Sequence, residues 1–169
     1  HGRYEFKSIS FDGELLEKPK EKPLKFEFYG DSLTCGYGNL STTRNSPSPF
    51  GFLEHGYKTW CAHLCEKCGA EMSAVCRSGQ GVVTDCTGNP NGTLEKYYNM
   101  AVPSRNIKWD FSKYIPDVVF FNIGSNDMLY LRFYENAKVD WSVFKAKAKK
   151  IIDELRANAP DCKIIIPLE

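Results

Sequence analysis

The sequence has no histidine after His63, so the later part of the chain offers no imidazole for catalysis or metal binding. It has almost no net charge, +1 at pH 7, and therefore gives no reason to expect a nucleic acid or an anionic membrane as a partner. No apolar run approaches the roughly 18 residues of a membrane-spanning helix, so no membrane partner is expected. With 169 residues, 42% of them hydrophobic, the chain is long enough for one domain with a substantial core.

Cysteine, by contrast, is abundant. Seven cysteines are many for a cytosolic enzyme and favour a secreted protein, and the odd number leaves one thiol free or paired outside the chain. Cys61, Cys65 and Cys68 have the C-x3-C-x2-C spacing of an iron–sulfur ligand set. The same spacing continues an amphipathic helix, however, so we expect small buried thiols there, or one of them in a disulfide, with no metal and no cofactor.

The order of predicted elements indicates the fold class. Four segments resemble strands and begin at about Leu24, Glu71, Asp117 and Lys163. Each interval between them is long enough for the helical crossover that parallel strands require. Apolar residues at helical spacing predict helices over 57–68 and 141–155, the second capped by Asp140. This alternation predicts a three-layer α/β/α sandwich around a parallel, flavodoxin-like sheet.

The two ends of the chain do not resemble domain ends. Residues 3–11 predict a lone strand, and the charged, proline-containing stretch 15–22 predicts a linker. We therefore assign residues 1–22 to the tail of an upstream β domain and 23–169 to an α/β domain. A parallel strand at Lys163 without a covering helix would leave an apolar edge exposed, so we expect this domain to be incomplete at its C-terminus.

A serine lies in the turn that leaves the first predicted strand. Gly30-Asp31-Ser32-Leu33 follows the alternating run 24–29, which places the Ser32 hydroxyl above the end of the sheet. A serine performs acyl transfer only with a base to take its proton and donors to hold the oxyanion. The alternative is that Ser32 is a helix N-cap and has no chemical role.

Two further loops follow predicted strands at the same edge of the sheet. Ser78-Gly79-Gln80-Gly81 offers bare backbone N–H groups, and Gly124-Ser125-Asn126-Asp127 offers the Asn126 amide as a neutral donor. Taken alone, the last loop is also compatible with an Asx turn or a cap. We expect Asp31 to brace its own turn and Asp127 to fix the Asn126 loop through backbone hydrogen bonds.

These motifs resemble the SGNH (GDSL) hydrolases over about residues 24–167. Residues 28–34 resemble the first block of that superfamily, Ser78-Gly79-Gln80-Gly81 the second and Gly124-Ser125-Asn126-Asp127 the third. The sequence is more similar still to the second carbohydrate esterase family, through residues 30–39 and 109–127. That family joins a small β-sandwich to an SGNH domain, so residues 1–22 would be the strand and linker that follow the sandwich.

The resemblance implies an esterase that removes acetyl groups from plant cell-wall polysaccharide such as xylan. Ser32 would be the nucleophile, with an oxyanion hole formed by the Ser32 amide, Gly79 and Asn126. Three residues would support these loops: Asp31, Gly124 and Asp127. The family's late catalytic histidine has no counterpart here, which implies that a C-terminal segment absent from this chain carries it.

Several alternatives remain open. Tyr37, Trp109 and Tyr130 are candidates for lining a sugar cleft, although core packing explains any one of them equally well. His55 is a candidate substitute base, against the simpler interpretation of a solvated loop histidine. The rival functions are a non-catalytic carbohydrate-binding module with a hydrolase fold, and a lipid or aryl esterase of the same fold.

Overall fold

The computed structural model describes residues 6–43 and 53–167, and a parallel four-stranded sheet forms its centre. The strand order is β2-β1-β5-β6, with bounds Leu24–Gly30 (β1), Ala70–Cys76 (β2), Val118–Asn122 (β5) and Lys163–Ile165 (β6). In the central strand, Gly30 is in register with Cys76 on one side and Asn122 on the other. Each strand begins within one residue of its predicted start, and the parallel sheet is confirmed.

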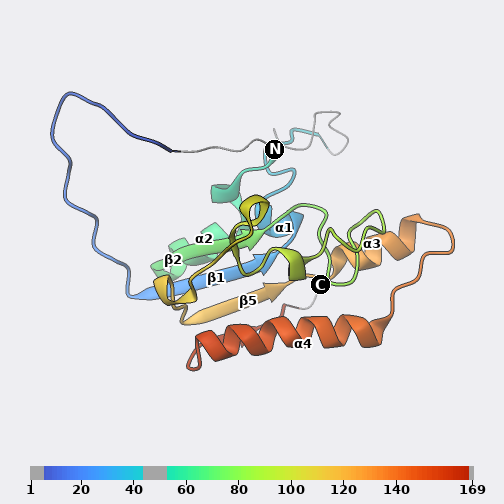
Figure 1. Cartoon of the computed structure of the whole chain (residues 1–169). Helices are drawn as coiled ribbons and strands as arrows, with labels where there is room; N and C mark the ends of the chain where they lie inside the picture. Colours follow the sequence, from blue (N-terminus) through green and yellow to red (C-terminus); the bar gives the residue numbers. More distant parts are fainter. Residues whose placement is uncertain (1–5, 44–52, 168–169) are drawn as a thin grey trace.

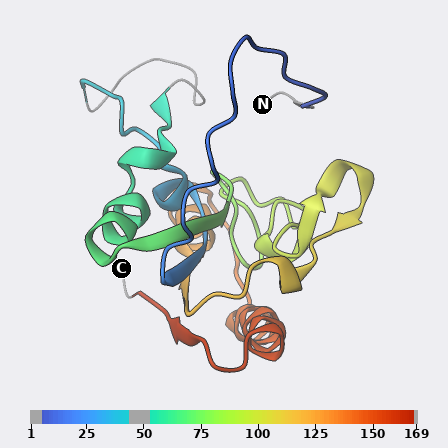
Figure 2. The same ribbon diagram turned by 90° about the vertical axis from the view of Figure 1, so that its left-hand side faces the viewer.

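Helices cover both faces of this sheet (Figures 1 and 2). Helix α2 (Trp60–Cys68) lies on one face, and helix α4 (Trp141–Asn158) lies on the other. Asp140 caps α4 as predicted, because its carboxylate accepts hydrogen bonds from Ser142 N (2.8 Å) and Val143 N (3.3 Å). The predicted α/β/α arrangement is therefore confirmed.

The remaining elements are short. Two helices, α1 (Ser32–Cys35) and α3 (Ser125–Phe133), begin at the carboxyl edge of the sheet, toward which the strand arrows point in Figure 1. A small antiparallel pair, β3 (Met100–Val102) and β4 (Ile107–Lys108), lies apart from the main sheet in Figure 2. Single 3-10 turns occupy Gly56–Lys58, Leu94–Lys96, Pro103–Arg105 and Phe111–Lys113.

Aromatic packing dominates the core on the α2 face. Phe28 and Phe120 stack with ring centroids 4.8 Å apart, and the Trp60 ring meets Phe28 edge-on at 5.2 Å. Cys61 and Cys65 of α2 are buried against the same rings, as expected, whereas Cys68, the last residue of the helix, is exposed, so the expectation of a buried thiol was wrong there. The α4 face is packed by mixed aliphatic and aromatic side chains: Tyr29, Leu94, Val119, Phe121, Ile151 and Leu155.

The N-terminal segment differs from the prediction. Residues 6–11 form no strand, and Phe6 and Ile9 are 80% and 69% exposed. A strand needs a neighbour for its backbone hydrogen bonds, and within the described ranges this segment has none. Residues 3–5 of the predicted strand lie outside the described part of the chain. Residues 15–22 are irregular and exposed, as a linker would be.

No helix in the described ranges is long and apolar enough to cross a lipid bilayer.

A buried carboxylate lies in the middle of the central strand. Glu27 is 2% exposed and accepts hydrogen bonds from the Tyr29 hydroxyl (2.9 Å) and the Ser73 hydroxyl (3.1 Å). Among the described residues, no cation pairs with it. Burial raises the pKa of Glu27, because the ionised form loses hydration that two hydroxyl groups replace only in part.

This site makes the stability of the protein depend on pH. A carboxyl whose pKa is higher in the folded state binds more protons when folded, so stability falls as pH rises from the unfolded pKa through the folded one. We expect Glu27→Gln, which cannot ionise, to raise the melting temperature relative to wild type by more at pH 8 than at pH 5. Thermal unfolding at both pH values measures this, with the exposed Glu135→Gln as control. Equal differences at the two pH values would contradict it.

Candidate functional site

The three predicted strand-end loops meet at the carboxyl edge of the sheet. The Asn126 side-chain amide lies 3.3 Å from an Asp31 carboxylate oxygen and 2.8 Å from the carbonyl oxygen of Gln80. These contacts join residues that are 95 and 46 positions apart in the chain. The serine turn, the glycine loop and the asparagine loop therefore surround one small region.

The turn that carries Ser32 is too tight for a side chain at its first residue. A Cβ on Gly30 would lie 2.0 Å from the Thr34 hydroxyl oxygen and 2.9 Å from the Asn122 carbonyl oxygen. Asp31 then caps α1 by accepting a 3.0 Å hydrogen bond from Leu33 N, and Ser32 is the first helical residue. Ser32 is half-buried, and no described residue hydrogen-bonds its hydroxyl.

Asp31 links its own turn to the third loop. Besides Leu33 N, its carboxylate accepts hydrogen bonds from the Ser125 hydroxyl and the Asn126 amide. Only 1% of Asp31 is exposed, and this burial raises the pKa of its carboxyl, an effect that the hydrogen bonds counteract. Asp31 thus braces its turn as predicted and also orients Asn126. The sequence analysis gave Ser125 no part in this, although it lies inside the third block.

Gln80 fastens the second loop to the first. Its side-chain amide donates a 2.6 Å hydrogen bond to the backbone carbonyl of Gly30. The backbone carbonyl of Gln80 in turn accepts a hydrogen bond from the Asn126 side chain. Gly79 has a φ of +87°, a conformation that side chains rarely adopt, and within the described residues its N–H has no acceptor. The sequence analysis missed Gln80 as an organising residue. Its position between two glycines at a strand end was the available signal.

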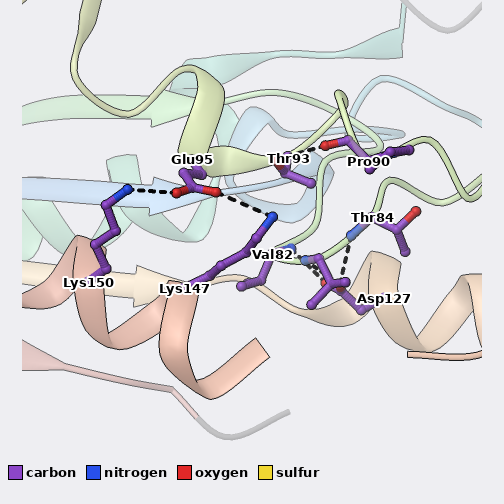
Figure 3. Close-up of polar contacts among 9 residues, drawn as sticks. Val82, Thr84, Pro90, Thr93, Glu95, Asp127, Lys147 and Lys150 are labelled. Carbon is purple, nitrogen blue, oxygen red and sulfur yellow. Dashed lines mark hydrogen bonds and ion pairs between the residues drawn. The ribbon is translucent and has the colours of Figure 1, made fainter. Parts of the chain in front are cut away.

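Asp127 joins the asparagine loop to the segment that follows the second block. Its carboxylate accepts hydrogen bonds from the backbone N–H groups of Val82 (2.8 Å), Val83 (2.7 Å) and Thr84 (3.2 Å), and Figure 3 labels Val82 and Thr84 among these donors. It therefore fixes the Asn126 loop through backbone hydrogen bonds, as expected, and the sequence did not indicate that the donors would be residues 82–84. A Cβ on Gly81 would lie 2.4 Å from this carboxylate, so the approach requires glycine there.

The other end of that segment is tied to α4. Glu95 forms ion pairs with Lys147 (3.3 Å) and Lys150 (2.8 Å), which both project from α4 in Figure 3. The hydrogen bond from Lys150 is the main reason why the pKa of Glu95 is lowered. The chain between Val82 and Glu95 is thus anchored at both ends, which restricts the movement of the glycine loop before it.

The three candidate substrate-binding residues lie in different surroundings. Tyr37 is 43% exposed, and its N–H donates to the Ser32 carbonyl at 2.9 Å, so it lies beside the serine turn. The Tyr130 ring of α3 is half-buried and packs against Gly88. Trp109, which follows β4, is half-buried, and its backbone N–H donates a hydrogen bond to the backbone carbonyl of Asn99. Within the described ranges, no hydrogen bond joins it to the three loops.

His55 is not the solvated loop histidine that we expected. It is half-buried, and its Nδ1 is buried without a hydrogen-bond partner among the described residues. Its backbone N–H bonds to the Gly36 carbonyl at 3.2 Å, which places it against the C-terminal end of α1. The sequence pattern does not reveal that this loop folds back against Gly36.

An open hollow of about 450 Å³ adjoins the serine turn on the α2 side of the sheet. Its lining comes from the ends of several elements: Leu33, Asn39, Thr59, Trp60, Asn122 and Pro167. Leu33, which lines the hollow, is the residue that follows Ser32 in the chain.

A parallel α/β/α sandwich with a serine turn, a glycine loop and an asparagine loop at one edge defines an SGNH-type hydrolase domain. Residues 28–169 match the GDSL-like lipase/acylhydrolase family, and the chain belongs to that family.

The chain is also similar to individual esterases. The chain is 34% identical over 165 residues to the cellulase/esterase CelE of Acetivibrio thermocellus, covering 96% of this chain and 19% of CelE. It is 26% identical to an acetylxylan esterase/glucomannan deacetylase of Cellvibrio japonicus, covering 75% of this chain and 36% of that protein. A family two carbohydrate esterase from Clostridium thermocellum, solved in complex with cellohexaose, superposes with a TM-score of 0.80 at 33% identity. That match covers 90% of this chain and 45% of the solved one, so the chain spans less than half of these relatives.

Proposed function

We propose that the parent protein is a serine esterase that removes O-acetyl groups from plant cell-wall polysaccharide of the xylan type. The observation that carries the proposal is the contact between the serine turn and the Asn126 amide, with the Gly79 loop beside them. This arrangement supplies a nucleophile and oxyanion donors at one point, which is what acyl transfer requires. The names of the relatives, an esterase and an acetylxylan esterase/glucomannan deacetylase, support the acetyl substrate.

In the proposed mechanism, the Ser32 hydroxyl attacks the acetyl carbonyl and gives up its proton to a base. The resulting oxyanion accepts hydrogen bonds from the backbone N–H groups of Ser32 and Gly79 and from the Asn126 amide. The Asn126 amide already donates to Asp31 at 3.3 Å and to Gln80 at 2.8 Å, so the longer bond, to Asp31, is the one exchanged. Collapse releases the sugar hydroxyl, and water then hydrolyses the acetyl-enzyme to acetate.

The base is proposed to be a histidine outside residues 1–169. Two observations support this: no histidine follows His63, and no described side chain accepts a hydrogen bond from the Ser32 hydroxyl. The abundance of cysteine further supports a secreted protein. An enzyme that acts on cell-wall polysaccharide would work outside the cell that produces it.

The test uses the parent protein with acetylated xylan and measures released acetate, in parallel with labelling by a fluorophosphonate probe. We expect acetate release, labelling at Ser32, and faster cleavage of acetyl than of long-chain aryl esters. Binding of xylo-oligosaccharide without acetate release or labelling would establish the non-catalytic module instead. Faster cleavage of long-chain esters would establish a lipid or aryl esterase.

A further inference from the structure

A carboxylate beside the glycine loop takes no part in the proposed chemistry. Glu54 is half-buried, and its side chain accepts a hydrogen bond from the hydroxyl of Ser78, which lies 24 positions later in the chain. Among the described residues, no lysine, arginine or histidine pairs with Glu54, and this is its one side-chain hydrogen bond. The carboxylate is thus directed at the first residue of the second block.

The segment that carries Glu54 is fixed to the chain that follows the serine turn. His55 N donates to the Gly36 carbonyl (3.2 Å) and Leu40 N donates to the Leu53 carbonyl (3.2 Å), so one backbone hydrogen bond lies on each side of Glu54. The approach is close, because a Cβ on Gly36 would lie 2.6 Å from the His55 carbonyl oxygen. Gly36 is the C-cap residue of α1. The hydrogen bond of Glu54 therefore links the serine turn and its helix to the glycine loop.

The position of Ser78 determines where the Gly79 N–H lies. Gln80 N donates to the Arg77 carbonyl (3.3 Å), which closes a four-residue turn with Ser78 and Gly79 at its centre. The φ of +87° at Gly79 is typical of the third residue of a type II turn. The Gly79 N–H belongs to the peptide unit that joins the two central residues, and glycine has no side chain to restrict that unit. A hydrogen bond that fixes Ser78 therefore limits the movement of this N–H.

We propose that Glu54 is a positioning residue that holds the glycine loop, through Ser78, where the Gly79 N–H meets the oxyanion. The inference rests on the proposed function, in which that N–H is an oxyanion donor. Glu54 acts through Ser78 and takes no proton from Ser32. A hydrogen bond to a carboxylate is stronger than one between neutral groups. The bond is therefore well suited to hold the loop of the donor against the loop of the nucleophile.

Loss of this bond should slow the chemical step and leave substrate binding nearly unchanged. The oxyanion develops only in the transition state, so a displaced donor lowers kcat with little effect on KM. For Glu54→Ala in the parent protein, we expect kcat for acetate release to fall by about 10- to 100-fold, less than the roughly 10²- to 10³-fold loss on removal of a whole donor. Initial rates over a range of acetylated xylo-oligosaccharide concentrations separate kcat from KM.

Two other substitutions of Glu54 separate the hydrogen bond from the charge. Glu54→Gln removes the charge but keeps an oxygen at the same reach for the Ser78 hydroxyl, so we expect kcat within about threefold of wild type. Glu54→Asp keeps the charge but is one methylene shorter, so we expect a loss similar to that of alanine. The control is Glu66→Ala, which truncates an exposed glutamate of α2 and should keep the wild-type kcat.

A double variant shows whether Glu54 acts through Ser78. Ser78→Ala removes the donor of the same hydrogen bond and should lower kcat as Glu54→Ala does, and the two changes together should lower it no further than either alone. Melting temperatures verify that each variant is folded at the assay temperature. If Glu54→Ala does not fold, the comparison of Glu54→Gln with Glu54→Asp carries the test.

Three results would overturn the proposal: a wild-type kcat in folded Glu54→Ala, rescue by Glu54→Asp but not by Glu54→Gln, or losses that multiply in the double variant. Each of these is read against an active wild type. A wild-type protein that neither releases acetate nor is labelled at Ser32 by a fluorophosphonate would instead contradict the proposed function, and the role of Glu54 would fall with it.

Discussion

Replacing Ser32 with alanine in the parent protein is expected to lower kcat for acetate release by about 10⁴-fold or more. The change deletes only the oxygen that is proposed to attack the ester. The Ser32 carbonyl still accepts hydrogen bonds from Gly36 N (3.0 Å) and Tyr37 N (2.9 Å), so α1 should keep its shape. Initial rates on acetylated xylan, with melting temperatures to verify folding, measure the effect.

The matched control is Ser112→Ala. Ser112 is exposed, and among the described residues its hydroxyl bonds only to Asp110, which belongs to none of the three loops. We expect this variant to keep the wild-type rate. If Ser32→Ala also retained most of its activity while folded, Ser32 would not be the nucleophile, and the oxyanion roles of Gly79 and Asn126 would lose their basis.

Replacing Asp127 with alanine is expected to reduce the free energy of unfolding by about 4 kcal/mol. The substitution removes the acceptor of three backbone N–H groups, those of Val82, Val83 and Thr84, from a site that is 0% exposed. Each donor left unpaired in a buried site costs about 1–3 kcal/mol. Urea unfolding monitored by fluorescence or circular dichroism gives the difference.

Two further variants provide smaller expected losses of stability for comparison. Asp127→Asn keeps one acceptor oxygen but turns an amide donor toward backbone donors, so we expect roughly half of the loss seen with alanine. Asp153→Ala removes an exposed carboxylate paired only with Lys149, and it should change stability by no more than about 0.5 kcal/mol. A loss for Asp127→Ala as small as that for Asp153→Ala would show that the carboxylate does not hold the segment.

The sheet and its covering helices could be predicted because their signals are local. Apolar runs near Leu24, Val118 and Lys163 mark strands, of which the first two are buried and the third is a largely exposed edge, and the cap at Asp140 marks the start of α4. The lone strand over residues 3–11 was wrong where the structure describes it, because alternation reveals a strand's faces but not whether a partner exists. The β3–β4 pair was missed, since two or three residues, such as Ile107–Lys108, carry no periodic signal.

For the candidate site, the sequence indicated which loops meet but not how they are joined. Strand-end position placed Ser32, Gly79 and Asn126 at one edge of the sheet. The partners of Asp127 could not be found in this way, because a carboxylate in a loop can accept from any nearby N–H. Only the fold reveals that it reaches the chain 43 to 45 residues earlier.

The contacts of Asn126 have a consequence for how the site would work. Its amide is clamped by a carbonyl and a carboxylate before any ester arrives, and it is 3% exposed. In the proposed reaction only the longer bond, to Asp31, is exchanged, so the bond to Gln80 still holds the amide in place as negative charge develops. The orientation of this donor is therefore set when the protein folds, and each turnover would exchange one hydrogen bond without a search among rotamers.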